Sequence, residues 1–145
     1  MRLRFEQEFR APPAKAWPYL TDPKFMNDWS DAHIELLSPG PGGRPDEPGA
    51  KRQATIRALG SASHLVEEVL EARAPDRMVY RVVSGGLIRN HRGVVELTST
   101  PAGSRLIWQI EFGAPVPGLA TVLGWLFRPK MVQGLKKLAT LLGNG

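Results

Sequence analysis

The chain has 145 residues, of which 42% are hydrophobic and 23% are charged, and 19 Lys and Arg residues against 14 Asp and Glu residues give a formal net charge of +5. This length and composition are typical of one globular domain, which we expect to span residues 1–145. The chain has no cysteine, which excludes disulfide scaffolds, thiolate metal sites and cysteine nucleophiles.

The beginning of the chain predicts a strand followed by two short helices. Leu3, Phe5 and Phe9 share one face of an alternating segment whose other face is charged, which is typical of a strand with one wet face. Two prolines end this segment, and residues 14–20 then predict a short helix that stops near an Asp-Pro pair. A further helical turn is expected over residues 24–29.

The middle of the chain predicts a loop and then a series of strands. Residues 38–49 are rich in proline and glycine and are expected to form a mobile surface loop. The strand patterns that follow are joined by short turns, one of them at residues 59–61, and such short connections favour an antiparallel meander. The predicted strands cover residues 50–58, 63–72, 77–84, 88–98 and 104–112.

The last part of the chain changes to a helical period. Apolar side chains recur at steps of three and four residues from Leu119 to Leu142, which predicts one long amphipathic helix. Pro129 is expected to kink this helix or to divide it near Phe127. Because a curved antiparallel sheet needs a cover for its apolar face, we expect the sheet to wrap around this helix.

Four motifs accompany this order of elements. They are Pro-Ala-Lys-Ala-Trp-Pro-Tyr-Leu-Thr-Asp-Pro at residues 13–23 followed by Trp29, Glu-Ala-Arg-Ala-Pro-Asp-Arg at 71–77, His-Arg-Gly-Val-Val-Glu-Leu at 91–97, and Gly-Ser-Arg-Leu-Ile-Trp at 103–108. In this order the chain resembles, over nearly its whole length, the START-like helix-grip superfamily (SRPBCC), also called the polyketide cyclase/dehydrase-like or birch-pollen-allergen-like group.

The resemblance implies a fold class and a range of functions. The implied fold is α+β, with a curved antiparallel sheet of six to seven strands around a long C-terminal helix and two short helices after the first strand. Members hold lipids, sterols, quinones, polyketides or similar hydrophobic molecules in a cavity between sheet and helix, and some are cyclases or aromatases. No single catalytic signature runs through the group, so the resemblance assigns no catalytic residue, and fold alone does not decide function.

Two aromatic residues are candidates for the cavity wall. Trp108 shares one strand face with Leu106, Ile110 and Phe112, so it is expected to point inward, where it either fills the core or lines a ligand pocket. Tyr80 alternates with charged and apolar neighbours in a way that also places it inside. Its hydroxyl can donate to a ligand carbonyl or be anchored to backbone.

Three ionisable residues are candidates for binding or acid/base chemistry. Arg89 and His91 lie on the strand face that carries Val95 and Leu97, so both are expected to project toward the cavity. They are the candidate catalytic pair, because histidine moves protons near neutral pH and arginine holds an enolate or carboxylate. The alternative is that both meet solvent at the end of the strand. Glu68 is expected inside as a cavity carboxylate, although the opposite register places it in solvent.

The sequence also excludes several kinds of site. His33, His64 and His91 lie far apart, so no metal-ligand spacing is present, and we expect neither a metal nor another cofactor. No Gly-x-Ser-x-Gly turn or phosphate loop occurs. The basic residues are spread along the chain among acidic ones, so no nucleic-acid partner is expected. Because the N-terminus lacks an apolar signal and no apolar run is long enough to span a bilayer, we expect a cytoplasmic protein.

The segment at residues 117–128 is apolar on more than one face. Core packing is the favoured interpretation, and the alternative is peripheral membrane contact, with Trp125 at the interface and Arg128 and Lys130 near anionic headgroups. Three functions stay open: a binder or carrier of a hydrophobic small molecule, a polyketide aromatase/cyclase, and a protein-partner or quinone-pathway accessory module. The sequence does not fix the oligomeric state.

Overall fold

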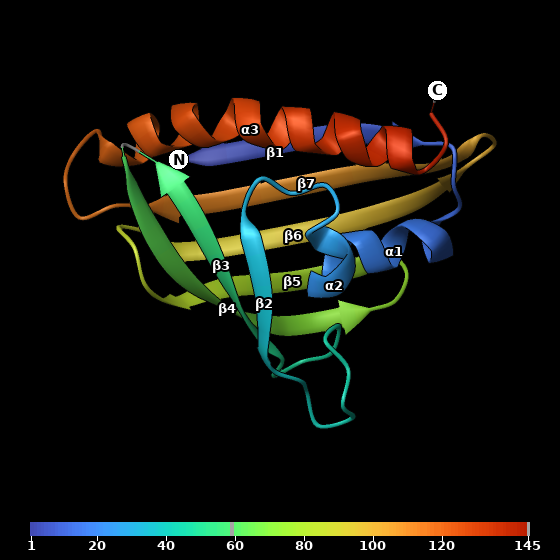
Figure 1. Cartoon of the computed structure of the whole chain (residues 1–145), viewed down its shortest axis with the longest axis horizontal. Helices are drawn as coiled ribbons and strands as arrows, with labels where there is room; N and C mark the ends of the chain where they lie inside the picture. The colour runs from blue at the N-terminus through green and yellow to red at the C-terminus, as the bar shows by residue number, and fades with distance from the viewer. Residues whose placement is uncertain (59, 145) are drawn as a thin grey trace.

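The computed structural model describes residues 1–58 and 60–144, which form one curved antiparallel sheet with helices on its concave side (Figure 1). Seven strands are joined in the order β1-β7-β6-β5-β4-β3-β2, so β1 and β2 are the edges. The strands are β1 (Arg2–Phe9), β2 (His33–Ser38), β3 (Lys51–Ala58), β4 (Ser61–Arg73), β5 (Arg77–Ser84), β6 (Arg89–Thr100) and β7 (Gly103–Gly113), and the helices are α1 (Pro13–Thr21), α2 (Pro23–Met26) and α3 (Leu119–Leu141).

The strands form where the sequence alternates between apolar and polar residues. In β7, Leu106, Trp108, Ile110 and Phe112 are all buried, and the residues between them are exposed or half-buried. β1 and β7 pair in antiparallel register, with Phe5 opposite Trp108. The predicted α+β meander is therefore confirmed, and the expected strand boundaries differ from the observed ones by at most two residues.

One strand of the sheet was not predicted from the sequence, and one predicted turn is only partly described. β2 was not predicted, because only Ile34 of its six residues is buried, so the segment carries little apolar periodicity. It pairs with β3 as an edge strand. Of the turn predicted at residues 59–61, residue 59 lies outside the described residues.

The long helix α3 lies along the sheet beside β1 (Figure 1). It is one continuous helix from Leu119 to Leu141 that includes Pro129, so of the two effects expected of this proline, division of the helix near Phe127 is wrong. Its second half contributes Met131, Leu135 and Leu138 to the core. Within the part of the chain that the structure describes, no helix combines the length and the apolar character needed to cross a bilayer.

The two short helices, α1 and α2, cover the end of the concave face that lies away from the start of α3 (Figure 1). Trp17 and Leu20 of α1 are buried in the core, and the indole Nε1–H of Trp17 donates to Asp46 Oδ2 over 2.8 Å. This bond fixes the Pro- and Gly-rich segment between β2 and β3 to α1. The backbone N–H of Gly49 also donates to the carbonyl of Val69, 2.9 Å away. The segment is thus attached to the body of the protein at two points.

Candidate functional site

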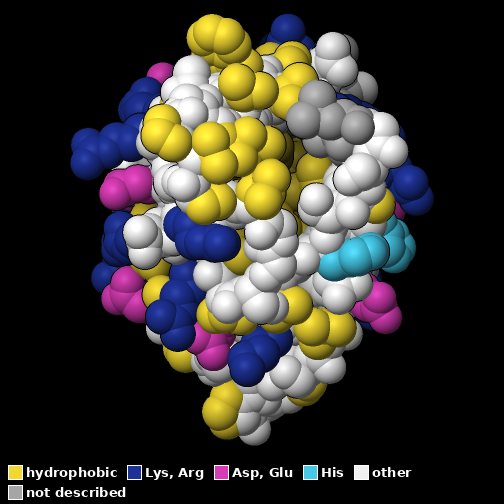
Figure 2. All heavy atoms as spheres, turned by 90° about the vertical axis from the view of Figure 1, so that its left-hand side faces the viewer, with side chains coloured by type: hydrophobic (Ala, Val, Ile, Leu, Met, Phe, Trp, Pro, Cys, Tyr) yellow, Lys and Arg dark blue, Asp and Glu magenta, His cyan; other side chains and the backbone are white. Residues whose placement is uncertain are grey.

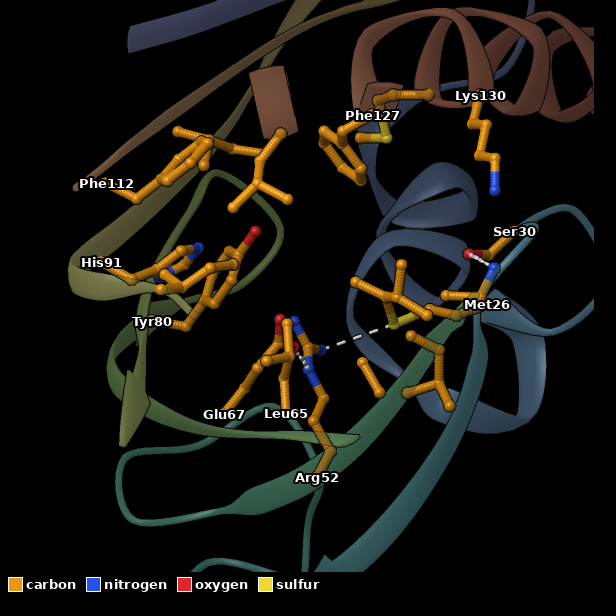
Figure 3. Close-up of a pocket in the computed structure, with 18 of the residues that line it drawn as sticks. Met26, Ser30, Arg52, Leu65, Glu67, Tyr80, His91, Phe112, Phe127 and Lys130 are labelled. Carbon is orange, nitrogen blue, oxygen red and sulfur yellow. Dashed lines mark hydrogen bonds and ion pairs between the residues drawn. The ribbon is translucent and has the colours of Figure 1, made fainter. Parts of the chain in front are cut away.

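A cavity of about 170 Å³ lies between the concave face of the sheet and α3 (Figure 3). Its wall is mainly apolar and aromatic. The apolar lining residues are Met26, Trp29, Ala32, Ile34, Ala54, Ile56, Leu65, Tyr80, Ile88, Trp108, Ile110, Phe112, Leu123, Leu126, Phe127 and Met131.

A buried ion pair forms the floor of this cavity. Arg52 on β3 and Glu67 on β4 are directly opposite in the ladder, and Arg52 Nε lies 2.8 Å from Glu67 Oε1. The Arg52 side chain is only 3% exposed, and its Nη1 also donates to the carbonyl of Thr21. Its guanidinium carbon lies 5.1 Å from the centre of the Tyr80 ring. Because both charges are taken from water, each depends on the other for stabilisation.

Tyr80 on β5 stands in the cavity wall with its hydroxyl toward the interior (Figure 3). The indole Nε1–H of Trp108 donates to this hydroxyl oxygen over 3.0 Å. The ring lies against Gly93 of β6, where a Cβ atom would collide with the phenol ring. Burial raises the pKa of Tyr80, and the negative charge of Glu67 raises it further, so the phenol keeps its proton at neutral pH.

His91 on β6 lies beside Tyr80, with 5.4 Å between the two ring centres. The backbone N–H of Val82 donates to His91 Nδ1 over 3.2 Å, which requires an unprotonated Nδ1 and leaves the proton on Nε2. Burial lowers the pKa of His91, against the opposing effect of Glu67. The imidazole is therefore neutral at pH 7 and carries a single N–H donor.

Three of the five residues proposed for ligand binding line the cavity, and two do not. Tyr80, His91 and Trp108 are in its wall. The predicted inward position of Glu68 is wrong, because its carboxylate forms an ion pair with Arg81 on the other side of the sheet, over 3.1 Å. Over residues 64–71 of β4 each face carries two apolar residues, Val66 and Leu70 on one and Leu65 and Val69 on the other, so periodicity alone did not decide which face is buried.

Arg89 is likewise not in the cavity. The ladder between β6 and β7 shifts between Arg89 and Arg92, and Asn90 in between has a φ of +52°. This bulge adds one residue and breaks the alternation on which the prediction relied. Arg89 is exposed, and its Nη1 lies 3.5 Å from the carbonyl of Ile88. The structure therefore separates Arg89 from His91, and the predicted pairing of the two in the cavity is wrong.

The ion pair of Arg52 and Glu67 was missed by sequence reasoning, although a signal was present. Arg52 lies between Ala50 and Ala54 on one face of its strand, and Glu67 lies between Leu65 and Val69. One charge in the middle of each apolar face, with opposite signs on consecutive strands, indicates a buried cross-strand pair. Among the described residues, no group of three or more His, Asp or Glu side chains is placed to hold a metal ion.

The opening of the cavity lies at the end of the molecule where α3 begins. Figure 2 shows hydrophobic side chains gathered around a hollow on this face. Trp125 is 69% exposed, so the favoured core interpretation of this residue is wrong. Lys130 lines the cavity at the same end, where its Nζ donates to the carbonyl of Arg57 over 2.7 Å. The exposed apolar residues on the loops and the helix at this end are Leu87, Val116, Val122, Trp125 and Leu126.

Solved structures share this arrangement over nearly their whole length. A solution NMR structure from Thermobifida fusca is 27% identical, with a TM-score of 0.77 over 99% of this chain and 93% of that one. A START superfamily protein from Mycobacterium smegmatis is 14% identical, with a TM-score of 0.78 over 97% and 98% of the two chains. Ara h 8.0201 is 15% identical, with a TM-score of 0.72 over 100% and 99%. These likenesses show the helix-grip fold.

The sequence comparisons agree with the fold. No curated protein matches the chain. The family model described as "Polyketide cyclase / dehydrase and lipid transport" matches residues 2–143, which includes every strand and helix that encloses the cavity. The chain therefore belongs to the polyketide cyclase/dehydrase and lipid transport family.

Proposed function

We propose that the protein binds a hydrophobic small molecule in the cavity between the sheet and α3. The observation that carries this proposal is the cavity of about 170 Å³ with a mainly apolar, aromatic wall. A dry apolar cavity of about 150 Å³ is large enough to bind benzene, so this one accommodates a molecule of one or two rings. Longer ligands extend through the opening beside Leu126 and Phe127. Membership of a lipid transport family supports the same proposal.

Native mass spectrometry of the protein purified under mild conditions tests the proposal. We expect an added mass from a bound molecule, which extraction then identifies as a lipid, quinone, polyketide or similar compound. Ala54→Phe places a ring into the cavity from β3 and should abolish this added mass, while Thr55→Phe, the next residue along the strand, is the matched control. Retention of the same bound molecule by Ala54→Phe would contradict the proposed location.

Acid/base chemistry of the aromatase/cyclase type is a second candidate. It is favoured by the neutral imidazole of His91 beside the protonated phenol of Tyr80, because both can exchange protons with an enolising ketone. Incubation with a short poly-β-ketone tests it. An enzyme should convert this compound faster than buffer does, and Tyr80→Phe should lower kcat, measured at saturating concentrations of the compound so that a change in affinity does not contribute. A binder leaves the compound unchanged.

A further inference from the structure

Two polar groups in the cavity wall offer hydrogen-bond donors for which the described part of the protein provides no acceptor. The hydroxyl oxygen of Tyr80 accepts from Trp108 Nε1, which occupies one of its lone pairs, while its own proton stays available for donation. Among the described residues, none accepts that proton. Tyr80 is 3% exposed, and a buried donor without an acceptor costs roughly 1–3 kcal/mol. A ligand oxygen at this position would remove that cost.

His91 provides a second donor in the same wall. Its Nδ1 is occupied by the backbone N–H of Val82, and this fixes the Nε2–H tautomer. Within the described part of the chain, no side chain or carbonyl accepts from Nε2. Because the rings of His91 and Tyr80 lie 5.4 Å apart in the same wall, one ligand oxygen can approach both donors, as Figure 3 lets the reader follow.

The charges around these donors do not suit an anion. Arg52 is the buried cation of the cavity, and Glu67 already neutralises it at 2.8 Å. A carboxylate at Tyr80 would therefore meet Glu67 without a free cation in return, after losing its own hydration. Arg57 and Lys130 are exposed at the rim, where a carboxylate would stay in water, away from Tyr80.

Building on the proposed function, we infer that the cavity selects apolar molecules that end in an uncharged oxygen acceptor, such as a ketone or quinone carbonyl, bound by the Tyr80 hydroxyl and the Nε2–H of His91. The apolar wall holds the body of the ligand, and the two donors orient its oxygen. Fatty acids and other apolar carboxylates of the same size are discriminated against. The ion pair of Arg52 and Glu67 gives the cavity a polar floor without adding a net charge.

Three probes with the same two-ring skeleton test this inference by equilibrium dialysis at pH 7.5. They are 2-acetylnaphthalene, 2-ethylnaphthalene and 2-naphthoate, which end in a ketone, a hydrocarbon and a carboxylate. We expect the ketone to bind at least about tenfold more tightly than the carboxylate, since burial of an uncompensated charge is costly. Equal or tighter binding of 2-naphthoate would overturn the inference while leaving the proposed function in place. Absence of binding by all three probes would overturn the inference, and a bound molecule found by native mass spectrometry would then show that the proposed function stands without it.

Variants separate hydrogen bonding from cavity shape. Tyr80→Phe removes one donor, and His91→Asn keeps an acceptor for Val82 while it removes the Nε2–H. Each variant should lower the affinity for 2-acetylnaphthalene by about five- to tenfold, the size of one net hydrogen bond. The affinity for 2-ethylnaphthalene should stay within about twofold of the wild-type value. Tyr19→Phe and His33→Asn, which lie outside the cavity, are matched controls. Equal losses for ketone and hydrocarbon, or no loss for the ketone, would overturn the inference.

Discussion

The carboxylate of Glu67 accepts a hydrogen bond from the guanidinium of Arg52 across two neighbouring strands, over 2.8 Å, on the floor of an otherwise apolar cavity. The two side chains are 3% and 13% exposed. Such a pair contributes little net stability compared with apolar residues of the same shape, because both charges lose their hydration. The same guanidinium lies 5.1 Å from the centre of the Tyr80 ring and also donates to the carbonyl of Thr21, so the pair faces the cavity and joins β3 to α1.

Loss of one partner of this pair should be costly. Glu67→Gln leaves Arg52 buried without a counter-charge, so we expect the free energy of unfolding to fall by about 3 kcal/mol, as measured by urea denaturation. Glu68→Gln is the matched control, because Glu68 pairs with the half-exposed Arg81 and such surface pairs contribute about 0–1 kcal/mol. If both variants lose the same stability, the Arg52–Glu67 pair is not desolvated as described.

Gly93 determines where Tyr80 can lie. A Cβ atom at this position collides with the Tyr80 ring, so Gly93→Ala should displace the phenol and reduce stability by about 1–3 kcal/mol, as overpacked cores do. Affinity for a two-ring ketone should fall as well. Gly113→Ala is the control, since its Cβ would meet only the Arg89 carbonyl, at an ordinary 3.8 Å. Thermal unfolding and dialysis measure both effects. Equal melting temperatures for the two variants would contradict this account.

Stability should depend on pH through His91. Burial lowers its pKa in the folded state, so the unfolded chain, with a histidine pKa of about 6.5, binds the proton first as the pH falls. The resulting stability is present above about pH 6.5 and is lost as the pH drops toward the folded pKa. Urea denaturation from pH 8 to pH 5 should show this loss in the wild type and in His33→Asn, and a smaller loss in His91→Asn. Parallel curves for all three would show that His91 is not desolvated.

The exposed tryptophan at the cavity opening should contribute little to stability. Trp125 is 69% exposed, so Trp125→Ser should change the free energy of unfolding by no more than about 0.5 kcal/mol. Leu138, on the same helix, is completely buried, and Leu138→Ala should cost about 2–5 kcal/mol. Circular dichroism during thermal unfolding compares the two. A large loss for Trp125→Ser would restore the core interpretation of residues 117–128.

Most of the fold followed from local patterns. Alternation in β7 and the short turns between strands gave the meander, and the apolar positions from Leu119 to Leu142 gave α3. β2 was not predicted, because an edge strand with one buried residue, Ile34, shows no alternation of apolar and polar residues. The helix continues past Pro129 because a proline removes one hydrogen bond and packing of the following turns can maintain the rest.

The candidate site was harder to predict, because it depends on register. Tyr80 and Trp108 point inward as expected, since each lies in a strand with a clear apolar face. Glu68 and Arg89 were misplaced for two different reasons: both faces of β4 carry two apolar residues between residues 64 and 71, and a bulge at Asn90 shifts β6. Neither feature can be read from periodicity alone. One charge within each apolar face already indicated a cross-strand pair, and the ladder shows that Arg52 and Glu67 are directly opposite.

The two halves of α3 differ in how many of their side chains are buried in the core, so we expect them to differ in how often they open locally. The second half packs Met131, Leu135 and Leu138 into the core, whereas the first half has only Gly124 fully buried and covers the cavity. Few buried contacts mean a low free energy of local opening. Amide hydrogens of residues 122–128 should therefore exchange with deuterium faster than those of residues 135–141. For the ligand proposed above, brief fraying of this end of the helix is the expected route of entry and exit, while the sheet and the other end of α3 persist.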